Sequence, residues 1–69
     1  GAARIGAELL LRIGRYDDAK QLYDAVIQNN ALPWARLGIA RSEIGMEKLP
    51  AAKRTLEGLI ADELLAQPG

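Results

Sequence analysis

Few residues of this 69-residue chain could do covalent chemistry. Asp17 and Asp18 are adjacent carboxylates, but adjacent residues of a helix point about 100° apart, so the pair suits a helix start better than acid–base catalysis. Ser42 is the only serine, and the chain has no histidine to activate it as a nucleophile. The sequence therefore predicts a protein that is not an enzyme.

The absence of cysteine and histidine also removes disulfides, thiol nucleophiles and the usual zinc ligands. We expect no metal and no cofactor. Nine basic residues balance nine acidic ones, so no net field favours nucleic acid or anionic lipid as a partner. A helix-turn-helix DNA reader using Lys53 and Arg54 is an alternative, which the zero net charge and the loop before Pro50 disfavour.

No apolar run reaches the length of a membrane span, and no signal-peptide pattern is present, so we expect a cytoplasmic protein without a membrane partner. A chain of this length predicts one small domain. Hydrophobic residues make up 49% of the chain but aromatic residues only 4%, which indicates a core of Leu, Ile and Ala. Because the chain lacks an initiator Met and begins within a helical pattern, we expect a piece of a longer protein.

Glycine and proline divide the chain into four helical segments, and nothing alternates with the period of a strand, so the predicted fold class is all-α. Gly14 is expected to end the first helix in the left-handed conformation, and Gly45 to end the third in the same way. Pro33 and Pro50 are expected to open the third and fourth helices. The predicted helices cover about 2–13, 16–28, 33–44 and 50–67.

Apolar residues recur at three- and four-residue steps along each predicted helix, which is typical of a helix with one face toward a core. In the first helix these residues are Ile5, Leu9 or Leu10, and Ile13, and in the second Ala19, Leu22, Tyr23, Val26 and Ile27. In the third, Trp34, Leu37, Arg41 and Ile44 fall on one side, and in the fourth the predicted buried face is Ala52, Leu56, Leu59, Ile60 and Leu64.

The two halves of the chain repeat. Ile13-Gly14 and Ile44-Gly45 are identical pairs at a spacing of 31, and both stand at ends of corresponding helices. In the second helix of each half, Ala19 matches Ala52 at a spacing of 33. We attribute the difference of two to a longer loop over 46–49.

This pattern resembles the tetratricopeptide repeat, a pair of antiparallel helices with a nominal period of about 34 residues. The resemblance implies antiparallel helical hairpins in a right-handed α-solenoid fragment, within a single domain over 1–69, with one repeat over about 1–30 and a second over about 31–67. The phrase at 33–38 also resembles repeats that follow receiver domains in some bacterial response regulators. The matching residues are Gly14, Tyr16, Ala19 and Tyr23 in the first half and Trp34, Leu37, Gly38, Ala52 and Leu56 in the second, while Ala3 and Gly6 depart from the pattern.

Small residues in such repeats let helices approach closely, so we expect Gly38 and Ala19 at helix crossings. Tyr16 and Trp34 are expected to fill gaps between successive helices. A stacking platform for a ligand or a base is the alternative role of Trp34.

The family resemblance implies a protein or peptide partner bound on the concave face, which the first helix of each pair forms. The eight residues placed on that face by the repeat alignment are Arg4, Glu8, Leu11, Arg12, Ala35, Ile39, Ser42 and Glu43. The alternative function is structural self-association, most simply as a homodimer, because apolar residues of the last helix have no following repeat to cover them. These residues are Leu59, Ile60, Leu64 and Leu65.

Overall fold

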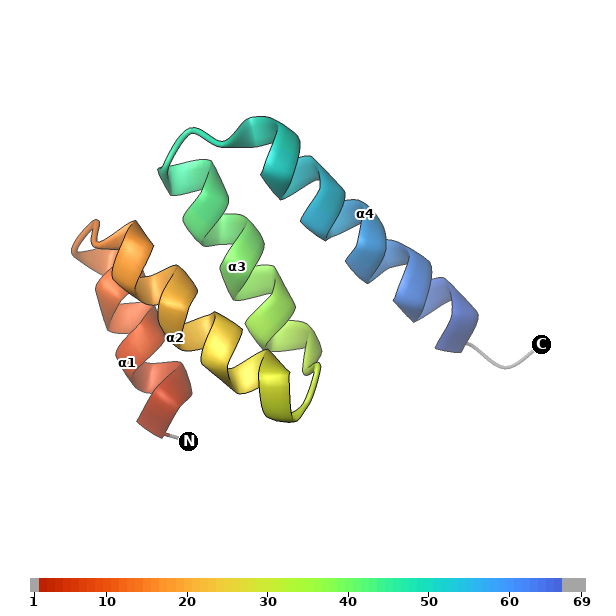
Figure 1. The fold of residues 1–69 in the computed structure, drawn as a ribbon, viewed down its shortest axis with the longest axis horizontal. Coiled ribbons are helices and arrows are strands. Elements are labelled where there is room, and N and C mark those ends of the chain that lie inside the picture. The colour runs from red at the N-terminus through yellow and green to blue at the C-terminus, as the bar shows by residue number, and fades with distance from the viewer. Residues whose placement is uncertain (1, 67–69) are drawn as a thin grey trace.

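The computed structural model describes residues 2–66 and contains four α-helices over that range, with no strand. The all-α prediction is confirmed, and each observed boundary lies close to its predicted position. No helix in 2–66 combines the length and the apolar character that crossing a bilayer requires. The helices are α1 (Ala2–Arg12), α2 (Tyr16–Asn29), α3 (Pro33–Gly45) and α4 (Leu49–Ala66) (Figure 1).

Each helix packs against the next one along the chain, and α1 also reaches α3. Among the described residues, α4 packs only against α3. The result is an elongated arrangement of about 41 × 28 × 17 Å, in which α1 and α4 lie at opposite ends (Figure 1). Consequently α1 and α4 each have a side that no other helix of this range covers.

The turn after α1 is a Schellman motif centred on Gly14, which has a φ of +84°. The N–H of Arg15 donates to the carbonyl of Leu10 at 2.8 Å, and the N–H of Gly14 donates to that of Leu11 at 3.2 Å. These bonds satisfy carbonyls that a helix end otherwise leaves without partners. The expectation that Gly14 ends the first helix in the left-handed conformation is confirmed.

The turn after α3 is the same motif, but its left-handed residue is Glu47, with a φ of +61°. The N–H of Lys48 donates to the carbonyl of Glu43 at 2.8 Å, and the N–H of Glu47 donates to that of Ile44 at 3.0 Å. Gly45 is the last helical residue and has no positive φ, so the prediction that it ends α3 as Gly14 ends α1 is wrong.

The two motifs fix the register of the internal repeat. Gly14 corresponds to Glu47, and Tyr16, the start of α2, corresponds to Leu49, the start of α4. Both pairs have the same spacing as Ala19 and Ala52, and we call this correspondence the Ala19–Ala52 register. The connections over 13–15 and 46–48 therefore have equal length, and the longer second loop predicted from the sequence does not exist. The identity of Ile13-Gly14 with Ile44-Gly45 is not a structural correspondence.

Small residues dominate the buried positions. The ring of Tyr23 occupies the space that a Cβ at position 38 would need, and the ring of Tyr16 does the same at position 45. The expectation that Gly38 and Ala19 lie at close helix contacts is confirmed, since Ala19 is also fully buried. The other buried alanines are Ala7, Ala35, Ala40 and Ala52.

Trp34 is half-buried and packs against the core beside Tyr23. Their ring centroids are 6.2 Å apart with an interplanar angle of 65°, an edge-to-face arrangement. The guanidinium of Arg4, on α1, lies 5.3 Å from the Trp34 ring centroid. Because Trp34 contacts both α1 and α2, it is a packing residue between helices. This is the role expected of it from the sequence.

Several apolar residues predicted to face the core lie on the surface. On α1, Ile5 and Leu9 are exposed, as is Ile13 just past its end, whereas Ala7 and Leu11 are buried. The same prediction is wrong for four residues of α3 and α4, which are also exposed. They are Leu37, Ile44, Ile60 and Leu64. The buried positions are those where two helices approach closely, and most of these positions carry small side chains.

A candidate interaction groove between α1 and α3

Two adjoining hollows run along the surface between α1 and α3. One has a volume of about 340 Å³ and the other about 310 Å³, and both are lined by Leu11 and Arg41. We call their combined surface the α1–α3 groove. Its lining residues are Glu8, Leu11, Arg12, Tyr16, Arg41, Ile44 and Gly45.

The repeat explains why these residues come together. In the Ala19–Ala52 register, Glu8 corresponds to Arg41, Leu11 to Ile44, and Arg12 to Gly45. Three positions on one face of α1 therefore meet the equivalent positions on α3. Tyr16 enters the groove from α2, because its ring lies against Gly45.

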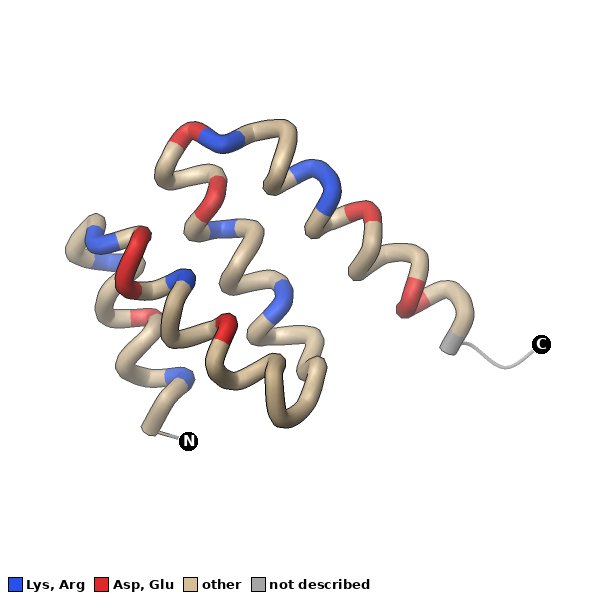
Figure 2. The backbone as a smooth tube through the Cα atoms, in the orientation of Figure 1, with Lys and Arg blue, Asp and Glu red and all other residues tan. Residues whose placement is uncertain are grey.

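Charge in the groove is predominantly positive. Within residues 2–66, neither Arg12 nor Arg41 takes part in an ion pair. Glu8 is paired with Arg4 at 3.4 Å, an exposed contact within α1 that contributes about 0.2–0.5 kcal/mol. Figure 2 shows that charged positions are otherwise spread along all four helices. Two guanidinium groups that lack carboxylate partners over this range give the groove a local excess of positive charge.

The groove also has apolar surface. Leu11 is buried and lies at its base, whereas Ile44 is about half exposed. Tyr16, half-buried against Gly45, continues this surface. An aliphatic side chain of a bound segment could therefore be covered next to the two arginines.

Tyr23 lies within electrostatic reach of the groove. Burial raises the pKa of its hydroxyl above the ordinary value of 10.0, and the negative charge of Glu8 raises that pKa further. Arg41 and Arg4 lower the pKa of Tyr23, by smaller amounts than burial raises it. The Tyr23 hydroxyl therefore stays neutral at physiological pH.

The structure separates the eight residues predicted on the concave face into two groups. On α1, Arg4, Glu8 and Arg12 are at the surface, and Leu11 lies beneath them in the groove. The four from α3 are buried and do not line an open surface, which corrects their predicted placement. These four are Ala35, Ile39, Ser42 and Glu43.

The polar members of the buried group are satisfied inside the protein. The Ser42 hydroxyl donates to the carbonyl of Gly38 at 2.9 Å, within α3. The Glu43 carboxylate accepts a hydrogen bond from the Thr55 hydroxyl of α4 at 2.7 Å. Ser42 and Glu43 are therefore structural residues at helix contacts.

The error on α3 follows from the repeat register. The four α3 residues were matched to Arg4, Glu8, Leu11 and Arg12 with the spacing of the identical Ile-Gly pairs. That spacing is two residues shorter than the spacing of Ala19 and Ala52, which the structure shows to be the correct one. A shift of two rotates a position by about 200° around a helix, which moves it from the surface to the core. The observed register gives instead Leu37, Arg41, Ile44 and Gly45, of which the last three line the groove.

Arg41 is the functional candidate that sequence reasoning missed. The signal that could have identified it was the spacing of Ala19 and Ala52, which gives the observed register for the whole repeat. The identical Ile-Gly pairs obscured it.

The residues predicted for self-association lie on the outer part of α4. Ile60, Leu64 and Leu65 are exposed, and Leu59 is half-buried. Arg36 of α3 and Asp62 form an ion pair beside them, which links α3 to α4.

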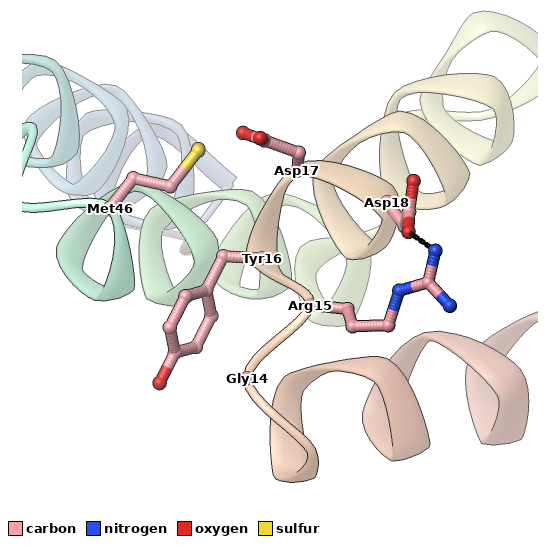
Figure 3. Close-up of a pocket in the computed structure, with 6 residues that line it drawn as sticks. All are labelled: Gly14, Arg15, Tyr16, Asp17, Asp18 and Met46. Atoms are coloured by element: carbon pink, nitrogen blue, oxygen red, sulfur yellow. Dashed lines mark ion pairs between the residues drawn. The ribbon is translucent and has the colours of Figure 1, made fainter.

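A third hollow, of about 280 Å³, lies at the turn between α1 and α2 (Figure 3). Arg15 pairs with Asp18 at 2.6 Å, whereas Asp17 points in a different direction. The ring of Tyr16 points away from both carboxylates (Figure 3). The two acidic residues are in the first turn of α2, where they interact favourably with the helix dipole.

Comparisons of the chain with known protein families, with curated proteins and with solved structures find no match.

Proposed function

We propose that this protein is a non-catalytic interaction module of the tetratricopeptide type, which binds a segment of a partner protein in the α1–α3 groove. The observation that supports this proposal best is the proximity of Arg12 and Arg41, neither of which has a carboxylate partner among the described residues, to the apolar surface of Leu11 and Ile44. The period of the internal repeat and the sequential packing of four helices are also consistent with such repeats.

The chemistry of the groove defines the kind of segment that it would bind. A guanidinium group binds a carboxylate through two parallel hydrogen bonds, which gives orientation as well as affinity. The neighbouring aliphatic surface favours a leucine-like side chain close to that carboxylate. We therefore expect a short segment in which acidic and aliphatic residues lie next to each other.

Selection from a random peptide library on the immobilised chain tests this proposal. Bound peptides should be enriched in Asp or Glu beside Leu, Ile or Val. For a selected peptide, the double variant Arg12→Gln/Arg41→Gln should raise the Kd at least tenfold, because each charge-assisted hydrogen bond contributes about 1.5–3 kcal/mol.

The matched control is Lys53→Gln/Arg54→Gln, which removes the same charge from exposed positions of α4 outside the groove. This control should leave the Kd within about twofold. Equal losses in both double variants would show that binding follows net charge and not the groove, and a library that yields no acidic–aliphatic consensus would contradict the proposed ligand.

A further inference from the structure

We propose that copies of this chain associate head to tail, with the outer face of α4 in one copy packing on the outer face of α1 in the next. This contact would repeat, between chains, the contact that α2 and α3 make within one chain. The contact requires no bound peptide, although it shares one residue, Arg12, with the α1–α3 groove.

The Ala19–Ala52 register carries α2 onto α4 and α1 onto α3. The chain therefore contains one complete α2–α3 contact. In addition, α4 carries the residues equivalent to the α2 side of that contact, and α1 carries the residues equivalent to its α3 side.

The side of α2 that faces α3 carries two tyrosines. Tyr16 and Tyr23 lie against Gly45 and Gly38, and Ile27 continues their stripe one turn further on. The equivalent residues of α4 are apolar, and two of the three are exposed in the described part of the chain. They are Leu49, which is 61% exposed, Leu56, which is half-buried, and Ile60, which is 58% exposed.

The side of α3 that faces α2 carries Gly38 and Ser42, and Met46 follows just past the helix end. Gly38 receives the Tyr23 ring, Ser42 is fully buried one turn later, and Met46 lines a hollow together with Tyr16. The equivalent residues, two on α1 and one just past its end, are also apolar, and they are exposed within 2–66. They are Ile5, Leu9 and Ile13, which are 62%, 50% and 65% exposed.

The two uncovered faces are thus the two sides of one interface. Applying the observed α2–α3 pairing to them places Leu56 opposite Ile5, where the internal contact has Tyr23 on Gly38. In the contact between chains, a leucine and an isoleucine take the places of the tyrosine ring and the glycine. The two helices therefore each contribute an aliphatic side chain of similar size. At the next contact Leu49 meets Arg12, whose methylene groups can cover a leucine while its guanidinium stays in water.

A second copy is the occupant that accounts for both faces together. Pairing two α4 faces in a symmetric dimer would leave Ile5, Leu9 and Ile13 exposed on both chains. A contact between different faces is heterologous, and it continues from chain to chain unless the rotation closes a ring. We therefore expect an average mass that increases with concentration beyond that of a dimer.

Sedimentation velocity of the 69-residue chain and two blocked variants tests this inference. Ile5→Glu disables the α1 face and Ile60→Glu disables the α4 face, so each variant alone should be monomeric. An equimolar mixture should form a 1:1 dimer and no larger species, because the intact α4 face of the first variant meets the intact α1 face of the second. Leu37→Glu, at an exposed position of α3 outside both faces, should associate like the unmodified chain.

Helical circular dichroism checks that each variant folds, and Leu9→Lys with Leu49→Lys provides a second pair that blocks the same two faces. A monomeric unmodified chain at high micromolar concentration would overturn the proposal. So would self-association of Ile5→Glu equal to that of the unmodified chain, which would indicate α4–α4 pairing. A mixture of the two variants that stays monomeric would also overturn it.

Discussion

The ring of Tyr23 lies in the space above Gly38 that any larger residue would fill with its own side chain. The same relationship links Tyr16 to Gly45, two helical turns away along each helix and in opposite directions. Two tyrosines of α2 therefore pack into two glycine positions of α3, which fixes both the spacing and the antiparallel register of these helices. The proposed contact between chains uses the same pairing of positions.

Gly38→Ala should destabilise the protein by about 1–3 kcal/mol, because the added methyl group overlaps the Tyr23 ring, which has little space to move. Gly6→Ala is the matched control. Its Cβ would meet only Leu22 Cδ2, at an ordinary 3.5 Å, so the better helix propensity of alanine should stabilise α1 by up to about 1 kcal/mol. Urea unfolding measures both changes, and similar effects of the two substitutions would contradict the packing described here.

The two Schellman turns should respond to substitution in opposite directions. Gly14 and Glu47 both have a positive φ, but only Gly14 is free of the steric cost that a Cβ adds in this conformation. Glu47→Gly should therefore stabilise the protein by about 0.5–1 kcal/mol, and Gly14→Ala should destabilise it by about 1 kcal/mol. Thermal unfolding of the two variants provides the comparison, and a loss of stability in Glu47→Gly would argue against a left-handed residue at that position.

The hydrogen bond between Thr55 and the buried carboxylate of Glu43 should contribute measurably to the packing of α3 against α4. Thr55→Val keeps the shape of the side chain but removes the donor, so it should cost about 1–3 kcal/mol. Thr55→Ser retains the hydroxyl and should cost less. In a double-mutant cycle with Glu43→Met, which removes the acceptor, the absence of coupling energy would show that the bond does not form in solution.

The stability of the protein should fall above pH 10 because of Tyr23. Burial raises the pKa of this hydroxyl in the folded state above 10.0, so the unfolded chain loses the proton first and the folded state binds more protons in that range. The stabilisation is present below pH 10 and is lost as pH rises through the pKa of the folded state. Chemical unfolding between pH 8 and 11 should show a shallower decline for Tyr23→Phe than for the unmodified chain, and parallel declines would contradict this assignment.

The sequence by itself determined the number, the type and nearly the full extent of the helices. Gly14 and Pro33 act through local backbone geometry, the first by accepting a positive φ and the second by fitting the first turn of a helix. Such signals do not depend on neighbours in space. The close contact at Gly38 was also predictable, since a glycine inside a helix reduces stability unless close packing compensates.

The tertiary structure alone decided which side of each helix is buried and which residues meet in the α1–α3 groove. The apolar stripe of Ile5, Leu9 and Ile13 correctly indicated a helix, but helix packing buried the side that carries Ala7 and Leu11. When helices pack this closely, small residues occupy the contacts and larger aliphatic residues remain on the outside, so hydrophobicity does not identify the buried side. Arg41 and Arg12 line the same groove because of the register of the repeat. The equal lengths of the two turns show this register, whereas the identical Ile-Gly pairs in the sequence suggested a different one.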